Sequence, residues 1–233
     1  MNRFRHLILT RFNVRMEGRE PPSPEWLEHR LNVFERFCFP SVRAQTTTNF
    51  DWIVYCHPEM PESIRERIHA CSAWRQFRPV FFRGSFSQSM VQAAISELVT
   101  GFTHLITTRL DNDDAISKTF VETIQNRFTG QEFEFLNFTS GYIWKQGKLY
   151  SGRHTTNAFI SLVERTSNYS TVYCGNHMEL HRVGPITQIH KPAGWMQVVH
   201  DRNLLNCVWG QPHALEKIHE SFGLSAETLS GCR

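Results

Sequence analysis

Strand-like and helix-like segments alternate along the first 130 residues, and this alternation limits the possible folds more than any other feature. Four short apolar runs have the composition of buried strands, and each is followed by apolar residues at helical spacing. These strands are expected at residues 5–14, 50–56, 78–82 and 104–110. Strands that alternate with helices form parallel sheets through right-handed crossovers. The pattern therefore predicts an α/β, Rossmann-like fold with a mixed, mostly parallel, doubly wound central sheet flanked by helices.

The helix boundaries are marked by residues that start or interrupt helices. Ser23 before Pro24 is a start signal, and Pro40 is expected to interrupt the helix that follows. Ser85 or Ser87 is expected to cap the helix after the third strand, and Ser117 the helix after the fourth. A further helix is expected to begin at residue 61.

The pattern changes after residue 130, where hairpins replace the alternation. Residues 133–144 form one long strand-like run, a turn follows at 146–147, and strands are expected at 148–150 and 158–164. Residues 211–233 are expected to form a helix or to fray. We expect one domain over 1–233, with a nucleotide-binding half (1–115), an acceptor half (116–210) and a C-terminal tail (211–233).

Composition excludes several classes of protein. The 233 residues are 40% hydrophobic, which is enough for a substantial core. The net charge is +3, from 25 basic and 22 acidic residues, too balanced for a nucleic-acid binder. The six cysteines contain no C-x-x-C pair, and the N-terminus has only a four-residue apolar run. We therefore expect a cytoplasmic protein with reduced, buried thiols, no transmembrane segment and no nucleic-acid partner.

The fourth strand-like run ends in three carboxylates, at Asp111, Asp113 and Asp114. Carboxylates at i and i+2 on a turn can converge on one divalent cation, and Mg²⁺ or Mn²⁺ is often held by few protein oxygens plus substrate phosphates. The motif thus predicts a nucleotide-diphosphate site with Mn²⁺ or Mg²⁺ as cofactor. The alternative is a polar turn before a helix. The segment does not match an EF-hand, because Ile116 stands where the calcium loop needs glycine.

Two other segments carry candidate site residues. Ligands of open α/β sheets bind at the carboxyl ends of the strands, so the tip of the first strand is a candidate nucleotide contact: Thr10, Arg11, Phe12 and Asn13. Near the end of the chain, the apolar run 195–199 presents His200 and Asp201, and His200 is a candidate third metal ligand. His177 and His181 flank Glu179, but a zinc-protease helix needs its Glu directly after the first His.

Three motifs together carry a resemblance to a known family. They are TTRLDNDDAIS, FPSVRAQTTTNFDWIVYC and GWMQVVHDRN, in that order. Together they resemble the bacterial rhamnosyltransferase family, which is similar to GT-A-type glycosyltransferases, over roughly residues 3–210. The resemblance implies a GT-A-like fold.

The resemblance also assigns roles to residues of the acidic motif. It places Asp111 and Asp113 in a D-x-D motif that binds metal and nucleotide-sugar, which Asp114 extends. It places Arg109 and Asn112 at the donor, and His200 near the metal.

The implied activity is metal-dependent transfer of a sugar, with rhamnose as one candidate. The partners would be a nucleotide-diphosphate sugar donor and a hydroxyl on a saccharide or lipid-linked acceptor. An inverting enzyme needs a carboxylate base, for which Glu179, Asp201 and Asp114 are candidates. Glu179 is preferred, because the metal would hold the others as weakly basic anions. The alternatives are a phosphohydrolase or nucleotidyltransferase using the same carboxylates, and a non-enzymatic saccharide-binding module.

Overall fold

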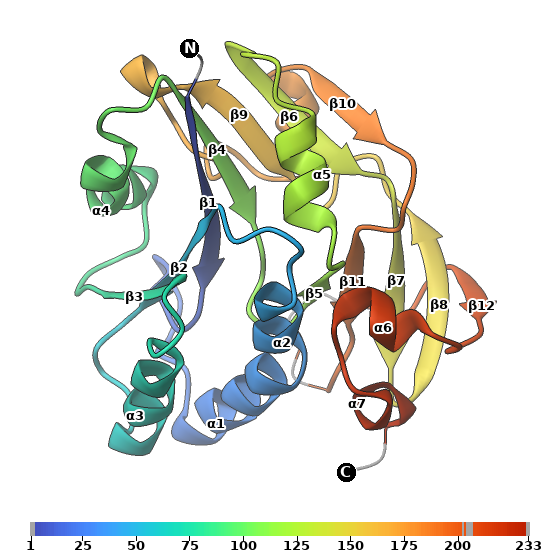
Figure 1. Cartoon of the computed structure of the whole chain (residues 1–233). Coiled ribbons are helices and arrows are strands. Elements are labelled where there is room, and N and C mark those ends of the chain that lie inside the picture. Colours follow the sequence, from blue (N-terminus) through green and yellow to red (C-terminus); the bar gives the residue numbers. More distant parts are fainter. Residues whose placement is uncertain (1–2, 202, 204–206, 232–233) are drawn as a thin grey trace.

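The computed structural model describes residues 3–201, 203 and 207–231, and two β-sheets form its framework (Figure 1). The larger sheet has seven strands in the order β10-β6-β9-β4-β1-β2-β3, and the smaller has five in the order β12-β8-β7-β11-β5. The strands of the larger sheet are β1 (Phe4–Arg11), β2 (Asp51–Cys56), β3 (Phe77–Phe81), β4 (His104–Arg109), β6 (Phe133–Phe138), β9 (Ser161–Arg165) and β10 (Ile186–Ile189). Those of the smaller sheet are β5 (Ala115–Ile116), β7 (Ser140–Lys145), β8 (Lys148–Arg153), β11 (Trp195–Val198) and β12 (Gln211–His213).

Helices cover both faces of the larger sheet. The helices of the described chain are α1 (Pro24–Val33), the π-helix η1 (Phe34–Cys38), α2 (Phe39–Arg43), α3 (Glu62–Cys71), α4 (Gln88–Val99), α5 (Phe120–Asn126), α6 (Ile218–Phe222) and α7 (Ala226–Ser230), with 3₁₀ turns η2 (Thr166–Asn168) and η3 (Leu180–Arg182). Of these, α6 and α7 pack with the smaller sheet. Val91 and Ile95 of α4 pack against Leu7 and Leu9 of β1. On the opposite face, α1, α3 and α5 pack with Ile8 of the same strand.

The pairing confirms the predicted mixed, mostly parallel α/β sheet. Strand β1 lies parallel to both β2 and β4, β2 is parallel to β3, and β10 is parallel to β6. Only β9 runs against its neighbours, β4 and β6. The four strands predicted in the first half are all present, although β1 ends at Arg11, so that Phe12 and Asn13 follow the strand.

The expected interruption at Pro40 is wrong. The helix beginning at Pro24 continues through the π-helical segment η1 into α2, which contains Pro40. A wider turn allows this, because the Phe39 N–H donates to the carbonyl of Phe34, five residues back. The predicted cap at its start is confirmed, since Ser23 accepts a hydrogen bond from the Trp26 N–H at 3.2 Å.

Other boundaries also differ from the sequence prediction. Ser117 does not cap α5, which begins at Phe120 with no side-chain cap. The cap of α4 is Ser87, which accepts from the Met90 N–H at 3.2 Å. The run 133–144 is two strands rather than one, because the chain leaves the larger sheet after β6 and enters the smaller sheet as β7. In place of one tail helix, the structure has strand β12 followed by two short helices, α6 and α7.

The cysteine side chains differ in exposure. Cys38 and Cys56 are buried free thiols, Cys71 and Cys174 are half-buried, and Cys207 is exposed. Cys232 lies outside the described residues. Within the described part of the chain, no helix combines the length and the apolar character that crossing a bilayer requires.

Candidate functional site

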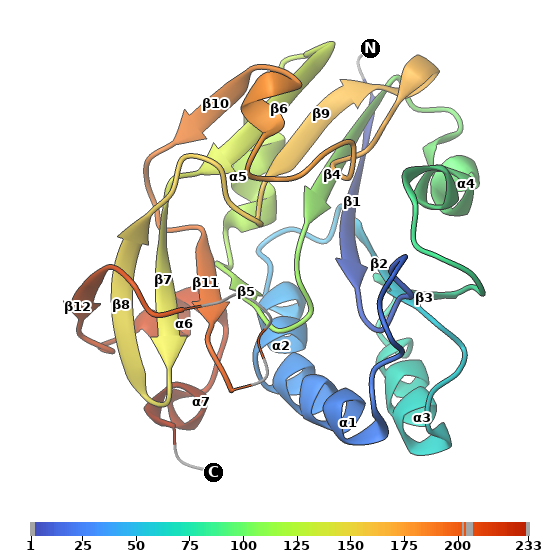
Figure 2. The same ribbon diagram turned by 180° about the vertical axis from the view of Figure 1, so that it is seen from behind.

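The acidic loop, residues 111–114, lies at the carboxyl edge of the larger sheet, where β1 and β4 end side by side (Figure 2). Parallel pairing of these strands brings the loop next to the segment that follows β1. The amide of Asn112 donates to the carbonyl of Phe12 at 2.9 Å, and the Leu110 N–H donates to the carbonyl of Leu9 at 3.2 Å. Two segments a hundred residues apart are thus joined at the predicted ligand-binding edge.

Asp113 is a buried acceptor of the loop, with a side chain only 5% exposed. Its Oδ2 atom forms an ion pair with Arg30 Nη1 at 2.5 Å and accepts from Asn203 Nδ2 at 2.9 Å. His200 Nε2 lies 3.2 Å from the same oxygen. The structure therefore brings together Asp113 and His200, two of the three predicted metal ligands.

Helix α1 supplies two side chains that sequence reasoning missed. Arg30 pairs with Asp113 and lies over the ring of Trp26, with 4.9 Å between its guanidinium carbon and the ring centroid. His29 Nε2 lies 3.1 Å from His200 Nδ1, so each ring nitrogen of His200 has a neighbour in the site. Nothing in the local sequence of α1 marks these residues, because their partners lie more than 80 positions away.

Asp111 is more open, at 28% exposure, and two arginines hold it. Its carboxylate lies 3.0 Å from Arg109 Nη2 and 3.5 Å from Arg11 Nη2. Burial raises the pKa of Asp111, but the charges of Arg109 and Arg11 outweigh this effect and lower it to about 2. Asp111 is therefore an anion at neutral pH, beside two cations.

The two arginines are positioned by aromatic and imidazole neighbours. The Arg11 guanidinium lies over the rings of Tyr173 and Phe86, at 5.4 and 5.7 Å from the centroids. Arg109 Nη1 lies 2.8 Å from His177 Nδ1. Burial and the charge of Arg109 lower the pKa of His177 to about 4, so this ring is neutral and its nitrogen can accept the hydrogen bond.

Asp114 faces into the protein and joins the loop to the smaller sheet. It is 3% exposed, and its Oδ1 atom accepts from the Val198 N–H of β11 at 2.8 Å. Burial, followed by the neighbouring charges of Asp113 and Asp111, raises the pKa of Asp114 well above its usual value. Its position supports the loop and the strand leading to His200.

Three residues predicted at the tip of the first strand have internal partners. Thr10 is fully buried and accepts from Trp52 Nε1 at 2.9 Å. Phe12 packs edge-on against Phe34 in the core, with 5.9 Å between centroids. Asn13 exchanges hydrogen bonds with the backbone of His57 at 2.8 and 3.1 Å. Arg11 is the member of this set whose side chain reaches the acidic loop.

Two of the three candidate bases, Glu179 and Asp201, lie on the surface. Glu179 precedes η3, and its half-exposed carboxylate pairs with Arg182 at 2.8 Å. Asp201 is exposed in the turn after β11, next to His200. Their assignment as bases stays a prediction.

The predicted metal ligands can be tested against this geometry. Among the described residues, no group of three His, Cys, Asp or Glu side chains has the arrangement of a metal site. Asp113 and His200 form a two-residue donor set, while Asp111 is turned toward the arginines. A pair of this kind fits Mg²⁺ or Mn²⁺ only if substrate oxygens complete the coordination, as they commonly do for phosphate-bound Mg²⁺.

Several buried polar atoms around the loop have no hydrogen-bond partner in the described structure. They are Nε of Arg30, Nε of Arg109 and Oδ1 of Asn112. Such atoms are rare in native proteins and call for an explanation. Their grouping beside Asp111 and Asp113 is consistent with a site whose polar network is completed by a ligand.

Comparison with known proteins gives one family. The family described as "Putative rhamnosyl transferase" matches residues 3–210 of this chain. No curated protein matches the sequence.

Similar solved structures share little sequence with this chain. Staphylococcus aureus TarS 1–349 is 10% identical, with 84% of this chain and 60% of that chain covered and a TM-score of 0.47. Its complex with UDP is 11% identical, with the same coverage and TM-score. A "putative nucleotide-diphospho-sugar transferase" from Desulfovibrio desulfuricans G20 is 10% identical, with 86% and 83% covered and a TM-score of 0.45. The chain thus spans less than two thirds of the TarS chain.

Proposed function

The chain belongs to the family described as "Putative rhamnosyl transferase", and from this premise we propose that it is a glycosyltransferase with a nucleoside-diphosphate sugar as donor. The acceptor is a hydroxyl group on a saccharide or a lipid-linked saccharide, and rhamnose is the first candidate for the transferred sugar. Family membership makes a sugar transferase the starting point, and the geometry of the acidic loop supports the donor class.

One observation carries the proposal: three arginines from three separate elements meet two aspartates at the carboxyl edge of the sheet. Arg11 is the last residue of β1, Arg30 lies in α1, and Arg109 is the last residue of β4. All three pair with Asp111 or Asp113. Guanidinium groups bind phosphate oxygens through paired, charge-assisted hydrogen bonds. A diphosphate entering here would meet cations that are already positioned.

The carboxylates have a different part in the proposal. Asp111, anionic and partly exposed, can accept hydrogen bonds from donor hydroxyl groups while Arg11 and Arg109 bind phosphate. Asp113 and His200 would hold Mn²⁺ or Mg²⁺ together with oxygens of the donor. When bound, the ion supplies positive charge that stabilises the leaving diphosphate.

The acceptor hydroxyl must lose a proton during transfer. We assign this role to Glu179 or Asp201, the exposed carboxylates that flank the site on the segments carrying His177 and His200. Positioned general bases contribute about 10²- to 10⁴-fold to rate. Replacing the correct residue by its amide should therefore lower kcat by at least about a hundredfold and leave donor binding unchanged.

The proposal is tested by calorimetric binding of UDP, GDP and dTDP, with Mn²⁺ or with EDTA. We expect one of them to bind in the presence of Mn²⁺. The variant Arg11→Gln should bind it about 10- to 100-fold more weakly, since hydrogen bonds to charged groups contribute about 1.5–3 kcal/mol. The matched control is Arg83→Gln, because Arg83 is 75% exposed and pairs only with surface Glu59 in the described structure.

Two results would contradict the proposal. If none of the three diphosphates binds with Mn²⁺ present, a non-enzymatic saccharide-binding module becomes the better explanation. If a nucleotide-sugar is hydrolysed rapidly without any acceptor, a phosphohydrolase is favoured. If a nucleoside diphosphate binds equally well with EDTA and with Mn²⁺, the proposed transferase activity stands but the proposed metal dependence does not.

A further inference from the structure

Three side chains meet at one oxygen of the acidic loop, Oδ2 of Asp113. Arg30 Nη1 lies 2.5 Å from this oxygen, Asn203 Nδ2 lies 2.9 Å from it and His200 Nε2 3.2 Å. Arg30 Nη1 also lies 3.3 Å from His200 Nε2. The guanidinium of Arg30 thus contacts both Asp113 and His200, the two side chains that form the candidate donor set for a metal ion.

The spacing of these two donor atoms suits one small ion. Adjacent ligands of an octahedral ion, each about 2.0–2.1 Å from it, lie about 3 Å apart, and Asp113 Oδ2 is 3.2 Å from His200 Nε2. In the free protein, however, the cation beside both atoms is the guanidinium of Arg30. A guanidinium and a divalent ion in contact with the same two atoms would repel each other strongly. An ion can therefore be held here only after Arg30 has moved away.

The contacts of Arg30 allow it a second position. Besides Asp113 and His200, its guanidinium lies over the ring of Trp26, one helical turn earlier in α1, with 4.9 Å between the guanidinium carbon and the ring centroid. Its buried Nε atom has no hydrogen-bond partner in the part of the chain that the structure describes. Part of its donor capacity is therefore unused in this position. A phosphate group offers a guanidinium two oxygens for paired hydrogen bonds.

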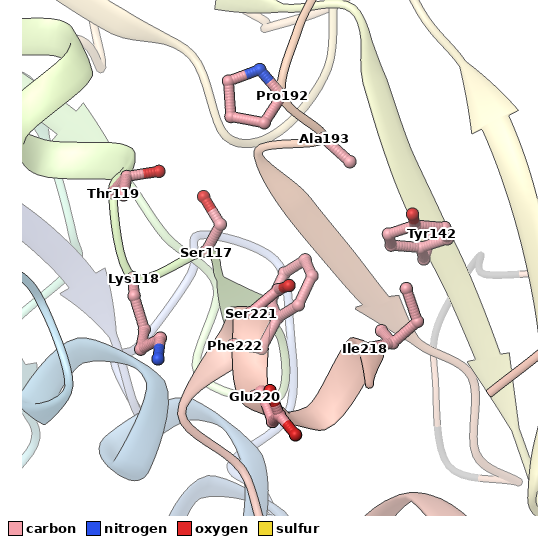
Figure 3. Close-up of a pocket in the computed structure, with 10 residues that line it drawn as sticks. All are labelled: Ser117, Lys118, Thr119, Tyr142, Pro192, Ala193, Ile218, Glu220, Ser221 and Phe222. Atoms are coloured by element: carbon pink, nitrogen blue, oxygen red, sulfur yellow. The ribbon is translucent and has the colours of Figure 1, made fainter. Parts of the chain in front are cut away.

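The space for an ion has to come from movement of a side chain. A cavity of about 380 Å³ lies between the smaller sheet and α6, but its walls include residues 117–119 and 192–193 and no residue of the acidic loop (Figure 3). That cavity therefore provides no room beside Asp113. Of the two N–H donors at Asp113, the amide of Asn203 is uncharged, so Arg30 is the one whose charge an ion would replace.

We propose that Arg30 is an internal cation that competes with a divalent metal ion for Asp113 and His200 and is released by the donor. This inference rests on the proposed function, because the releasing group is the diphosphate of a nucleotide-sugar. When the diphosphate binds, Arg30 exchanges Asp113 for phosphate oxygens, and Asp113 and His200 become available to the ion. Binding of the donor and binding of the metal are then coupled, and each raises the affinity for the other. Arg30 is thus a positioning residue that opposes metal binding before the donor is present.

The test measures Mn²⁺ binding to the full chain without nucleotide, by electron paramagnetic resonance of the free ion. Arg30→Gln removes the charge but leaves an amide that can donate to Asp113. Its dissociation constant for Mn²⁺ should be about 10- to 100-fold lower than that of wild type, because a hydrogen bond between charged groups no longer has to be broken. Arg11→Gln is the matched control. Arg11 pairs with Asp111, so its loss should change the constant at most about fivefold.

A second variant keeps Arg30 but weakens its hold. Trp26→Leu removes the ring over which Arg30 lies, and it should lower the dissociation constant for Mn²⁺ about two- to fivefold, the loss of one cation–π contact. If Arg30→Gln does not fold, Trp26→Leu decides the outcome. A second measurement adds UDP, GDP or dTDP. The diphosphate that binds should lower the Mn²⁺ dissociation constant of wild type, and by at least about tenfold more than it does in Arg30→Gln.

The proposal is overturned if Arg30→Gln binds Mn²⁺ no more tightly than Arg11→Gln, if neither of them binds it, or if the diphosphate increases Mn²⁺ affinity equally in wild type and Arg30→Gln. A different result would refute the proposed function instead. If Arg30→Gln gains affinity for Mn²⁺ but none of the diphosphates binds to wild type, the competition between Arg30 and the ion is confirmed and the nucleotide-sugar donor is refuted.

Discussion

Replacing Arg30 by methionine tests whether the Arg30–Asp113 pair holds the acidic loop in place. Asp113 is 5% exposed and Arg30 14%, so the variant leaves a buried carboxylate without its main counter-charge. Breaking a buried ion pair from one side costs about 3–5 kcal/mol. Asn203 and His200 remain beside Asp113. We therefore expect a loss of unfolding free energy at the lower end of this range, about 3 kcal/mol. For a chain of this size the melting temperature should fall by about 6–12 °C.

The assay is urea denaturation of four proteins in EDTA: wild type, Arg30→Met, Asp113→Asn and the double variant. Asp113→Asn removes the charge that Arg30 neutralises. The double variant should therefore lose less unfolding free energy than the two single variants lose together, by at least about 1 kcal/mol. Arg83→Met is the control, since its exposed pair with Glu59 should contribute no more than about 1 kcal/mol. Equal losses in Arg30→Met and Arg83→Met, or strict additivity in the cycle, would refute the reasoning.

Three further predictions concern the fold. Burial lowers the pKa of His6 to about 3. Below about pH 6.5, the unfolded chain therefore binds a proton at His6 that the folded chain does not bind. Stability should then fall on acidification, and His6→Gln should reduce the slope by about 1 kcal/mol per pH unit between pH 6 and 5, as followed by urea denaturation; an unchanged slope contradicts this. A Cβ on Gly141 would lie 2.0 Å from the ring of Trp195, whereas one on Gly175 would meet nothing closer than 3.4 Å. Gly141→Ala should thus cost about 1–3 kcal/mol more than Gly175→Ala, and equal melting temperatures would contradict the packing. Ser87→Ala removes the N-terminal cap of α4 and should lower the free energy of unfolding by about 1 kcal/mol, which a lower melting temperature would show. An unchanged melting temperature would contradict a stabilising role of the cap.

The sequence determines the alternation of the first half and the position of the acidic loop. Hydrophobic periodicity is local, so β1, β2, β3 and β4 could be read from runs of a few residues. The parallel-sheet rule then places the loop after β4 at the same edge of the sheet as the end of β1 without any structure, because the carboxyl ends of parallel strands share one edge. Arg11 and Asp111, from those two ends, do meet there.

The second half shows where local reading fails. The run 133–144 has the composition of one strand, yet Thr139 is the point where the chain passes from one sheet to the other. Which strand a segment pairs with depends on partners far along the chain, such as β9 for β6 and β11 for β7. Composition carries no record of those partners, so the division was not visible.

Tertiary structure alone decided how the site is completed. The carboxylates of the acidic motif can be recognised in the sequence. The partners of Asp113, however, are Arg30 of α1 and His200 and Asn203 of the segment after β11. Only His200 was expected. The polar face of a helix can be predicted from its sequence. Which residues this face contacts depends on how the helix packs on the sheet. Periodicity therefore determined where the ligand edge lies, and packing determined which charges surround it.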